Sequence, residues 1–148
     1  MKKYGSAILL SLILYMTIHT VGSAESMPKP PQESREELYH DMFITLLYPY
    51  INEPVEQYYS KFLTSSPMVH GYMVNVMSTD RVFGYRSFKF LVTREVTPVV
   101  GPHISVEKDR LVFDIDPSGP RLLEFQHLQT HELPEHWKHI IKNRSEKD

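Results

Sequence analysis

The chain has 148 residues, of which 16 are lysine or arginine and 18 are aspartate or glutamate, and it contains no cysteine. The formal net charge of −2 argues against a nucleic-acid-binding protein, because such a protein presents a basic face to the phosphates. The length fits one domain. If the domain is exported, the lack of cysteine favours a bacterial source, since small extracellular domains of animals are usually cross-linked by disulfides.

Residues 1–24 have the features of a secretory signal peptide. Two lysines precede an uncharged and mostly apolar run, residues 7–21, and small residues follow it up to Ala24. We expect cleavage after Ala24 and a mature protein that is secreted or otherwise extracytoplasmic. The alternative is a retained segment that anchors the chain to the outer face of the cell membrane, although the run is shorter than the ~20 residues of a typical span. Membrane contact is expected only in that case.

The remaining chain divides into a linker, a domain and a tail. Residues 25–33 hold three prolines and no buried-type pattern, which predicts an extended linker. We expect the domain over residues 34–128 and a C-terminal tail over residues 129–148. That tail contains a short amphipathic stretch, about 134–142, for which we expect a helix.

A helix is expected from residue 34, because Ser34 and Glu37 have the spacing of a capping box. The stretch SREELYHDMFITLLYPYI then has the helical period, with its apolar side chains on about half of the circle at 100 degrees per residue. These apolar residues are Leu38, Tyr39, Met42, Phe43, Leu46, Leu47 and Tyr50. We expect this half to cover a hydrophobic core and the acidic stretch around His40 and Asp41 to lie in water.

Pro49 should kink or end this helix, because proline lacks the backbone N–H and crowds the preceding turn. We expect Asn52 to cap a second piece over residues 53–62, which continues the first piece at an angle. Tyr58 and Tyr59 belong to the apolar side of that piece, and aromatic residues at such spacing are typical of a core.

The period changes from 3.6 to 2 after residue 67, which predicts strands. We expect strands over residues 68–78, 82–97 and 109–115, and a return strand that ends near Leu128. The first two strands should form a hairpin, and Asp116-Pro117-Ser118-Gly119 is typical of a type I turn before the fourth. The side chains expected to face inward are Tyr72, Val74, Val76, Phe88, Phe90, Val92, Leu111, Phe113, Ile115, Leu123 and Phe125.

The fold class that follows is α+β. We expect an N-terminal bent helix packed on a curved four-stranded antiparallel meander, in a cystatin-like or NTF2-like two-layer arrangement, with the short C-terminal helix beyond it. Such a sheet often leaves a cavity between itself and the helix.

No motif of catalysis is present in the sequence: there is no glycine-rich phosphate loop, no Gly-x-Ser-x-Gly elbow and no His-Glu-x-x-His. We therefore assign no catalytic, cofactor-binding or metal-binding residue and expect no cofactor. Four histidines near the C-terminus could bind zinc or copper, but we interpret them as exposed residues of the tail, because their spacing fixes no geometry. These are His127, His131, His136 and His139.

A second pair of histidines, His70 and His127, is in register with the inward faces of the first and fourth strands. They could meet Tyr58 or Tyr59 at the mouth of a helix–sheet cavity. Alternatively, each imidazole forms a hydrogen bond with a nearby group at the rim, as most buried polar groups do.

Four stretches of the chain resemble an uncharacterised family of short exported proteins from spore-forming Gram-positive bacteria, which is defined only as a domain of unknown function. They are SREELYHDMFITLLYPYINEPVEQYY, GYRSFKFLVT, the Gly101-Pro102-His103 corner, and LVFDIDPSG with its return strand LLEFQH. The resemblance covers most of residues 34–127. It implies export and a helix followed by a sheet, and it brings no activity or catalytic residue.

Our main hypothesis is an exported, non-enzymatic domain that binds either a protein partner through its sheet or a small ligand in the cavity. The alternative from another class is a metal-dependent or hydrolytic enzyme that uses His70, His103 or His127 together with a carboxylate, for which Asp114 and Glu124 are the candidates. A third possibility is a membrane-tethered module with an uncleaved signal segment.

Overall fold

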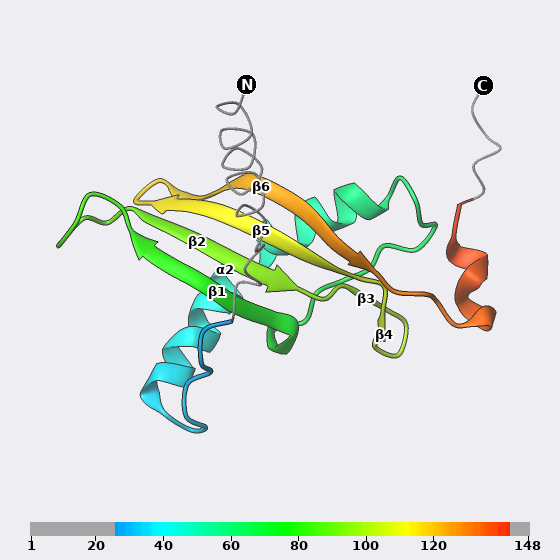
Figure 1. Ribbon diagram of the computed structural model, residues 1–148, viewed down its shortest axis with the longest axis horizontal. Coiled ribbons are helices and arrows are strands. Elements are labelled where there is room, and N and C mark those ends of the chain that lie inside the picture. The colour runs from blue at the N-terminus through cyan, green and yellow to red at the C-terminus, as the bar shows by residue number, and fades with distance from the viewer. Residues whose placement is uncertain (1–25, 143–148) are drawn as a thin grey trace, which may run out of the picture.

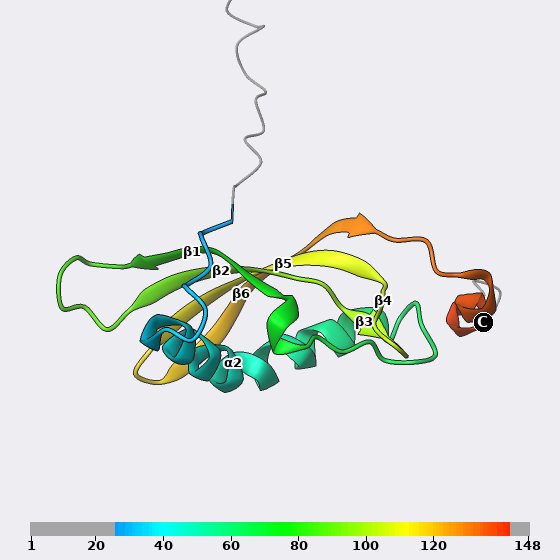
Figure 2. The same ribbon diagram turned by 90° about the horizontal axis from the view of Figure 1, so that it is seen from below.

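The computed structural model describes residues 26–142, so the predictions for the signal segment and for the last six residues lie outside the described part. One long helix, α2, lies across one face of a four-stranded antiparallel sheet (Figures 1 and 2). The fold class is therefore α+β, as predicted. No helix within residues 26–142 is long and apolar enough to cross a membrane.

Helix α2 spans Arg35–Tyr59 and begins at the predicted cap, where the Ser34 hydroxyl accepts a hydrogen bond from the backbone N–H of Glu37. Of the two outcomes expected at Pro49, a kink or an end, the helix does not end there, because it continues through Pro49 and Pro54 to Tyr59. The cap expected at Asn52 is therefore wrong. Asn52 instead ties the helix to the following segment, since its Oδ1 accepts from the backbone N–H of Val69. Burial of apolar residues on both sides of Pro49 outweighs the local cost of the proline.

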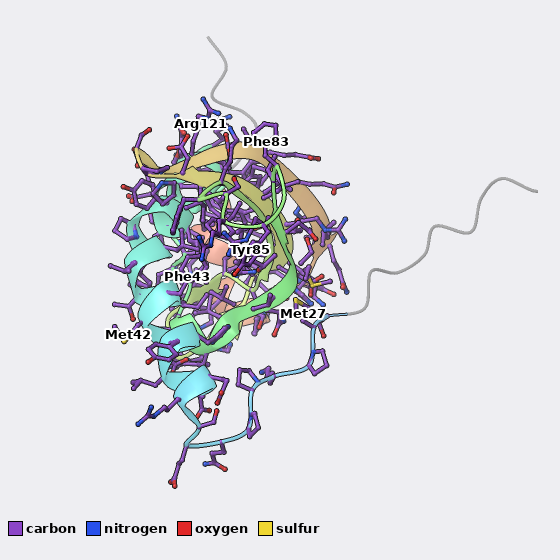
Figure 3. The ribbon with its side chains drawn as sticks, turned by 90° about the vertical axis from the view of Figure 1, so that its left-hand side faces the viewer. Met27, Met42, Phe43, Phe83, Tyr85 and Arg121 are labelled. Atoms are coloured by element: carbon purple, nitrogen blue, oxygen red, sulfur yellow. The ribbon has the colours of Figure 1, made fainter. Side chains whose placement is uncertain are left out.

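The side of α2 that faces the sheet was predicted only in part. Leu47 is buried as expected, but Leu46 is 71% exposed and Met42 is 54% exposed. Figure 3 shows Met42 pointing away from the sheet and Phe43 pointing toward it. The buried residues of the helix are Ile44, Leu47, Ile51, Val55 and Tyr59. The apolar residues of the first helical turns cover an arc too wide to define which side of the helix faces the sheet. The residues after Pro49 determine which edge of this arc packs on the sheet.

The main sheet is a meander in the order β1-β2-β5-β6, as the sequence predicted. Its strands are β1 Val74–Arg81, β2 Phe90–Val96, β5 Glu107–Asp116 and β6 Gly119–Thr130. Between β2 and β5 the chain forms a separate two-stranded sheet from β3, Val99–Val100, and β4, Ile104–Ser105. The predicted turn joins β5 to β6, and the Asp116 carboxylate accepts from the backbone N–H of Ser118.

The first hairpin differs from the prediction. Residues 68–73 are not part of the first strand, because Gly71–Met73 forms the 3-10 helix η1 and leaves Tyr72 exposed. The connection between β1 and β2 is the longer segment 82–89. Phe88 belongs to this segment and is 72% exposed, so its predicted inward position is wrong.

The inner face of the sheet otherwise follows the predicted alternation, with Val74, Val92, Leu111 and Phe113 buried. Leu123 is an exception at 53% exposure. The register between β5 and β6 shifts between Val112 and Phe113, which leaves Leu123 as the extra residue of a bulge. A bulge moves one side chain off the face that alternation assigns to it.

The C-terminal segment packs back on the domain through η2, a 3-10 helix over Glu135–Ile140. Ile140 is buried, and Ile141 forms a β-bridge with Leu63. The ring of Trp137 lies against Gly101 in the turn between β3 and β4.

Candidate functional site

Four polar side chains meet at the end of the helix–sheet interface where α2 stops. The Tyr59 hydroxyl lies 2.7 Å from Glu107 Oε2 and 2.6 Å from Asp109 Oδ2. The His127 Nδ1 atom lies 2.8 Å from Glu107 Oε2 and 3.1 Å from Asp109 Oδ1. The hydroxyl has one proton for two carboxylates, and so does the imidazole Nδ1. We call these four residues the β5–β6 polar cluster.

The positions of the cluster follow from strand geometry. Glu107 and Asp109 are two residues apart on β5, so both side chains point to the inner face of the sheet. His127 is the direct partner of Asp109 on β6. Tyr59 is the last residue of α2 and closes the cluster from the helix layer.

The cluster is mostly removed from water. Asp109 is fully buried and Tyr59 is 1% exposed, whereas the side chains of Glu107 and His127 are 17% and 30% exposed. Burial raises the pKa of both Glu107 and Asp109, although hydrogen bonds from Tyr59 act in the opposite direction. Burial also raises the pKa of Tyr59 far above its usual range, and the two carboxylate acceptors add to this effect. Tyr59 therefore remains a hydrogen-bond donor, and the carboxylates favour any positive charge near them.

The imidazole of His127 is held in one orientation. Its Nε2 atom lies 2.9 Å from the Thr130 hydroxyl, so Nδ1 is directed at the carboxylates. Tyr58 covers the ring on the side toward α2, with centroids 6.2 Å apart, and itself stacks on Phe125. A histidine fixed through its second nitrogen in this way resembles the histidines that bind metals in proteins.

The donor set suits a divalent cation. One carboxylate oxygen each from Glu107 and Asp109 and the Nδ1 atom of His127 all lie within 4.8 Å of one another. With bonds of about 2.0–2.2 Å, neighbouring ligands of one metal ion lie roughly 3 Å apart. The two distances from His127 Nδ1 to the carboxylate oxygens, 2.8 and 3.1 Å, are close to this value. Within residues 26–142 no other group of three histidine, aspartate or glutamate side chains converges in this way.

The structure separates the histidines that the sequence analysis considered together. His70 stacks on His103 at 4.8 Å between centroids, and the Tyr72 hydroxyl lies 2.6 Å from His103 Nδ1. His127 instead contacts Glu107, Asp109 and Thr130 and lies against Tyr58, so the two histidines lie in different places. Of the two interpretations, hydrogen bonding of the imidazole to nearby groups holds for His127. His136 and His139 are exposed, and neither belongs to the β5–β6 polar cluster.

The alternative hypothesis of an enzyme named Asp114 and Glu124 as the carboxylates beside a histidine, and neither belongs to the β5–β6 polar cluster. Asp114 forms ion pairs with Lys89 and Arg121, and Glu124 is exposed on β6. The sequence does contain a signal for the correct pair, because the Asp116–Gly119 turn sets the register of the hairpin. Counting back from that turn places residue 126 or 127 opposite Asp109, and the bulge in β6 selects His127.

Two clefts open beside the N-terminal half of α2, and neither is lined by Tyr58, Tyr59 or His127. The larger has a volume of about 560 Å³ and lies between α2 and η1. The smaller cleft lies where the start of α2 faces β1, with Glu37, His40 and Asp41 on one side and residues 74–76 on the other, so a cleft between helix and sheet is present at this edge, away from His127. The sheet side of α2 is occupied by the apolar core.

A family model described as "Protein of unknown function (DUF3888)" matches residues 39–129. The match includes all four residues of the β5–β6 polar cluster. No curated protein and no solved structure matches the chain.

Proposed function

We propose that this chain, which belongs to the DUF3888 family of proteins of unknown function, is a non-enzymatic binding domain for one divalent metal ion, held by Glu107, Asp109 and His127. We also propose, from residues 1–24, that it works outside the cytoplasm. The observation that carries the proposal is the convergence of two carboxylate oxygens, from Glu107 and Asp109, on His127 Nδ1 at 2.8 and 3.1 Å.

The charges of the cluster favour a cation as its ligand. Two carboxylates share one hydroxyl and one imidazole, and burial disfavours their negative charge. A divalent ion between them would reverse this effect, because an opposite charge within a few ångströms favours the ionised form. Tyr59 would then act as an outer donor that orients the carboxylates.

The ligand types favour zinc. Two carboxylates and one imidazole are borderline-to-hard ligands, which suit Zn²⁺ or Mn²⁺ better than a thiolate-preferring ion such as Cu⁺. Zinc affinity exceeds that of manganese for most sites of this type. His127 would bind through Nδ1 and donate from Nε2 to Thr130.

A second candidate function has one observation in its favour. Three protein ligands leave the fourth position of a tetrahedral zinc ion open, as in catalytic zinc sites. This arrangement supports metal-dependent hydrolysis with His127 as a ligand. A screen of esterase and phosphatase substrates with the zinc-loaded protein separates the two, since turnover that disappears in His127→Gln would favour the enzyme.

The location of the protein is a proposal from residues 1–24 and from the resemblance to exported proteins of spore-forming Gram-positive bacteria. Mass spectrometry of the protein from the producing cells checks it. A mature chain that begins at Glu25 is expected for secretion, whereas a mass that includes residues 1–24 would favour a membrane-anchored form. The cystatin-like or NTF2-like arrangement of one helix on an antiparallel sheet is likewise an interpretation, and it is supported by the position of α2 on one face (Figure 2).

Isothermal titration of the untagged protein with Zn²⁺ tests the metal proposal. We expect one ion per chain and an increase in the free energy of unfolding of about 2.7 kcal/mol at a free zinc concentration of 100 times the dissociation constant. Asp109→Asn and His127→Gln should abolish both effects.

The matched control is the double change of His136 and His139 to glutamine, which removes two exposed histidines outside the cluster. This variant should bind zinc as the natural chain does. Zinc binding that is lost in the control, or no zinc binding at all, would refute the proposal.

A further inference from the structure

The outer face of α2 carries an apolar patch that is largely exposed; Tyr50, at its edge, reaches the β5–β6 turn, where its hydroxyl lies near Gly119. The patch contains Leu38, Tyr39, Met42, Leu46, Pro49 and Tyr50, and the five apart from Pro49 are 42–71% exposed. After Tyr50 the same face is polar, with Glu53, Glu56 and Gln57. The patch is therefore confined to the first half of the helix. In Figure 1 this half, drawn in cyan, extends past the edge strand β1.

Opposite charges lie at the two ends of this patch. Arg35 and Glu53 are eighteen positions apart, which is five complete helical turns, so they lie on the same line along the helix as the patch. Neither Arg35 nor Glu53 forms an ion pair within residues 26–142. Arg35 is also the first residue of the helix, where the helix dipole disfavours a positive charge. Both charges are available to a partner.

We propose that a second copy of this chain covers the patch, with the two α2 helices packed antiparallel about a two-fold axis. In this arrangement Arg35 of one copy faces Glu53 of the other, and Met42 faces Leu46. Leu38 faces Tyr50 in the same way. Each of these pairs is centred on position 44, whose side chain points to the opposite side of the helix and into the core.

Self-association fits this patch because a two-fold interface must be complementary to itself. If one residue contacts a second across the axis, the second must also contact the first. The patch meets this requirement with apolar residues at its middle and one charge of each sign at its ends. An antiparallel pair also sets the helix dipoles in the favourable relative direction.

The size of the patch limits the strength of the dimer. From Leu38 to Tyr50 the helix rises about 18 Å, so the buried area falls at the low end of specific interfaces. We therefore expect a weak dimer that dissociates on dilution. The inference is independent of the metal proposal, because none of its residues belongs to the β5–β6 polar cluster.

Sedimentation velocity over a dilution series of the full chain tests the inference. We expect the mass of a dimer at high concentration and of a monomer after dilution. Arg35→Glu alone and Glu53→Arg alone should each raise the dissociation constant about tenfold, because each places like charges together at both ends of the interface. The double variant with both changes should restore dimerisation, since the two charges still face each other with signs exchanged.

Met42→Lys should prevent dimerisation, and its circular dichroism should remain that of the natural chain because Met42 is exposed. Lys61→Glu, a charge reversal outside the patch, is the matched control and should not change the dissociation constant. A monomer at every concentration would overturn the inference, and so would a double variant that fails to restore the dimer.

Discussion

The indole ring of Trp137 lies so close to Gly101 that a Cβ atom at position 101 would come within 2.2 Å of the ring atom Cη2. Gly101 has a φ of +49°, in the left-handed region that favours glycine. This contact joins η2 to the turn between β3 and β4. Trp137 is the single tryptophan of the chain and therefore reports on the contact.

Changing Gly101 to alanine should displace the indole ring and loosen the C-terminal segment. We expect a red-shifted tryptophan emission and a loss of about 1–3 kcal/mol in the free energy of unfolding, since overpacking of this kind costs that much. Fluorescence and urea denaturation measure the two effects. Gly84→Ala is the control, because Gly84 has a φ of +80° but open space around it. Equal effects in the two variants would show that backbone strain, and not the contact with Trp137, determines the result.

Leu46 and Leu47 provide a matched test of the helix orientation. Leu47 is 1% exposed and Leu46 is 71% exposed, although they are consecutive residues of α2. Leu47→Ala should lower the free energy of unfolding by about 2–5 kcal/mol, because it removes methyl groups from the core and leaves a cavity. Leu46→Ala should change it by less than about 0.5 kcal/mol. Urea denaturation at a low protein concentration, at which the chain is a monomer, measures both. The reverse order would mean that the helix is rotated.

The sequence predicted the elements of the fold whose signals are local. The cap at Ser34, the order of the sheet strands and the Asp116–Gly119 turn each depend on a few neighbouring residues, and the structure has all three. The orientation of α2 was predicted only in part, because it depends on contacts with the sheet: Leu47 is buried as expected, whereas Leu46 is exposed. The predicted alternation of inward and outward side chains also failed at Leu123. A bulge moves a side chain to the other face of the strand, and the amino-acid composition of the strand does not reveal it.

The candidate site was less predictable than the fold. His127 was among the histidines considered, but its partners Glu107 and Asp109 come from the neighbouring strand, and Tyr59 comes from the other layer. Only the register of β5 on β6 brings these residues together. A pattern search along the chain therefore finds the histidine and misses the carboxylates, because their spacing in sequence resembles no known metal motif.

Arg94 is a buried cation that allows a third prediction. It is 2% exposed on the inner face of β2, and its guanidinium lies over the Phe43 ring at 5.4 Å. Its Nη1 atom donates to the oxygens of Ser78, Thr79 and Thr93, but its Nε has no hydrogen-bond partner within residues 26–142. Burial lowers its pKa to about 10, so it stays charged at neutral pH, and no carboxylate within residues 26–142 forms an ion pair with it.

Arg94→Met should raise the free energy of unfolding by about 1 kcal/mol, because a long apolar side chain fills the space and removes the desolvated charge. Arg94→Ala should lower it by about 2 kcal/mol, since that change leaves a cavity. Urea denaturation of the two variants separates the effect of the buried charge on the free energy of unfolding from the effect of side-chain packing. A methionine variant as unstable as the alanine variant would show that the hydrogen bonds of Arg94 outweigh its desolvation.

The last prediction concerns the pH dependence of stability at Asp114. Its carboxylate lies 3.0 Å from Lys89 Nζ and also pairs with Arg121, and the hydrogen bond from Lys89 is the main cause of its lowered pKa. A carboxyl group with a lower pKa in the folded state stabilises the protein above its unfolded pKa of about 4 and loses this effect as the pH falls through the folded value.

Asp114→Asn should therefore lower the free energy of unfolding at pH 7, and the difference from the natural chain should shrink as the pH is lowered below about 4. Urea denaturation at a series of pH values measures the difference. Glu124→Gln is the control, because Glu124 is on the same hairpin but forms no ion pair within residues 26–142. If the effect of Asp114→Asn were the same at every pH, the side chain would act through packing or neutral hydrogen bonds, and its charge would contribute nothing to folding.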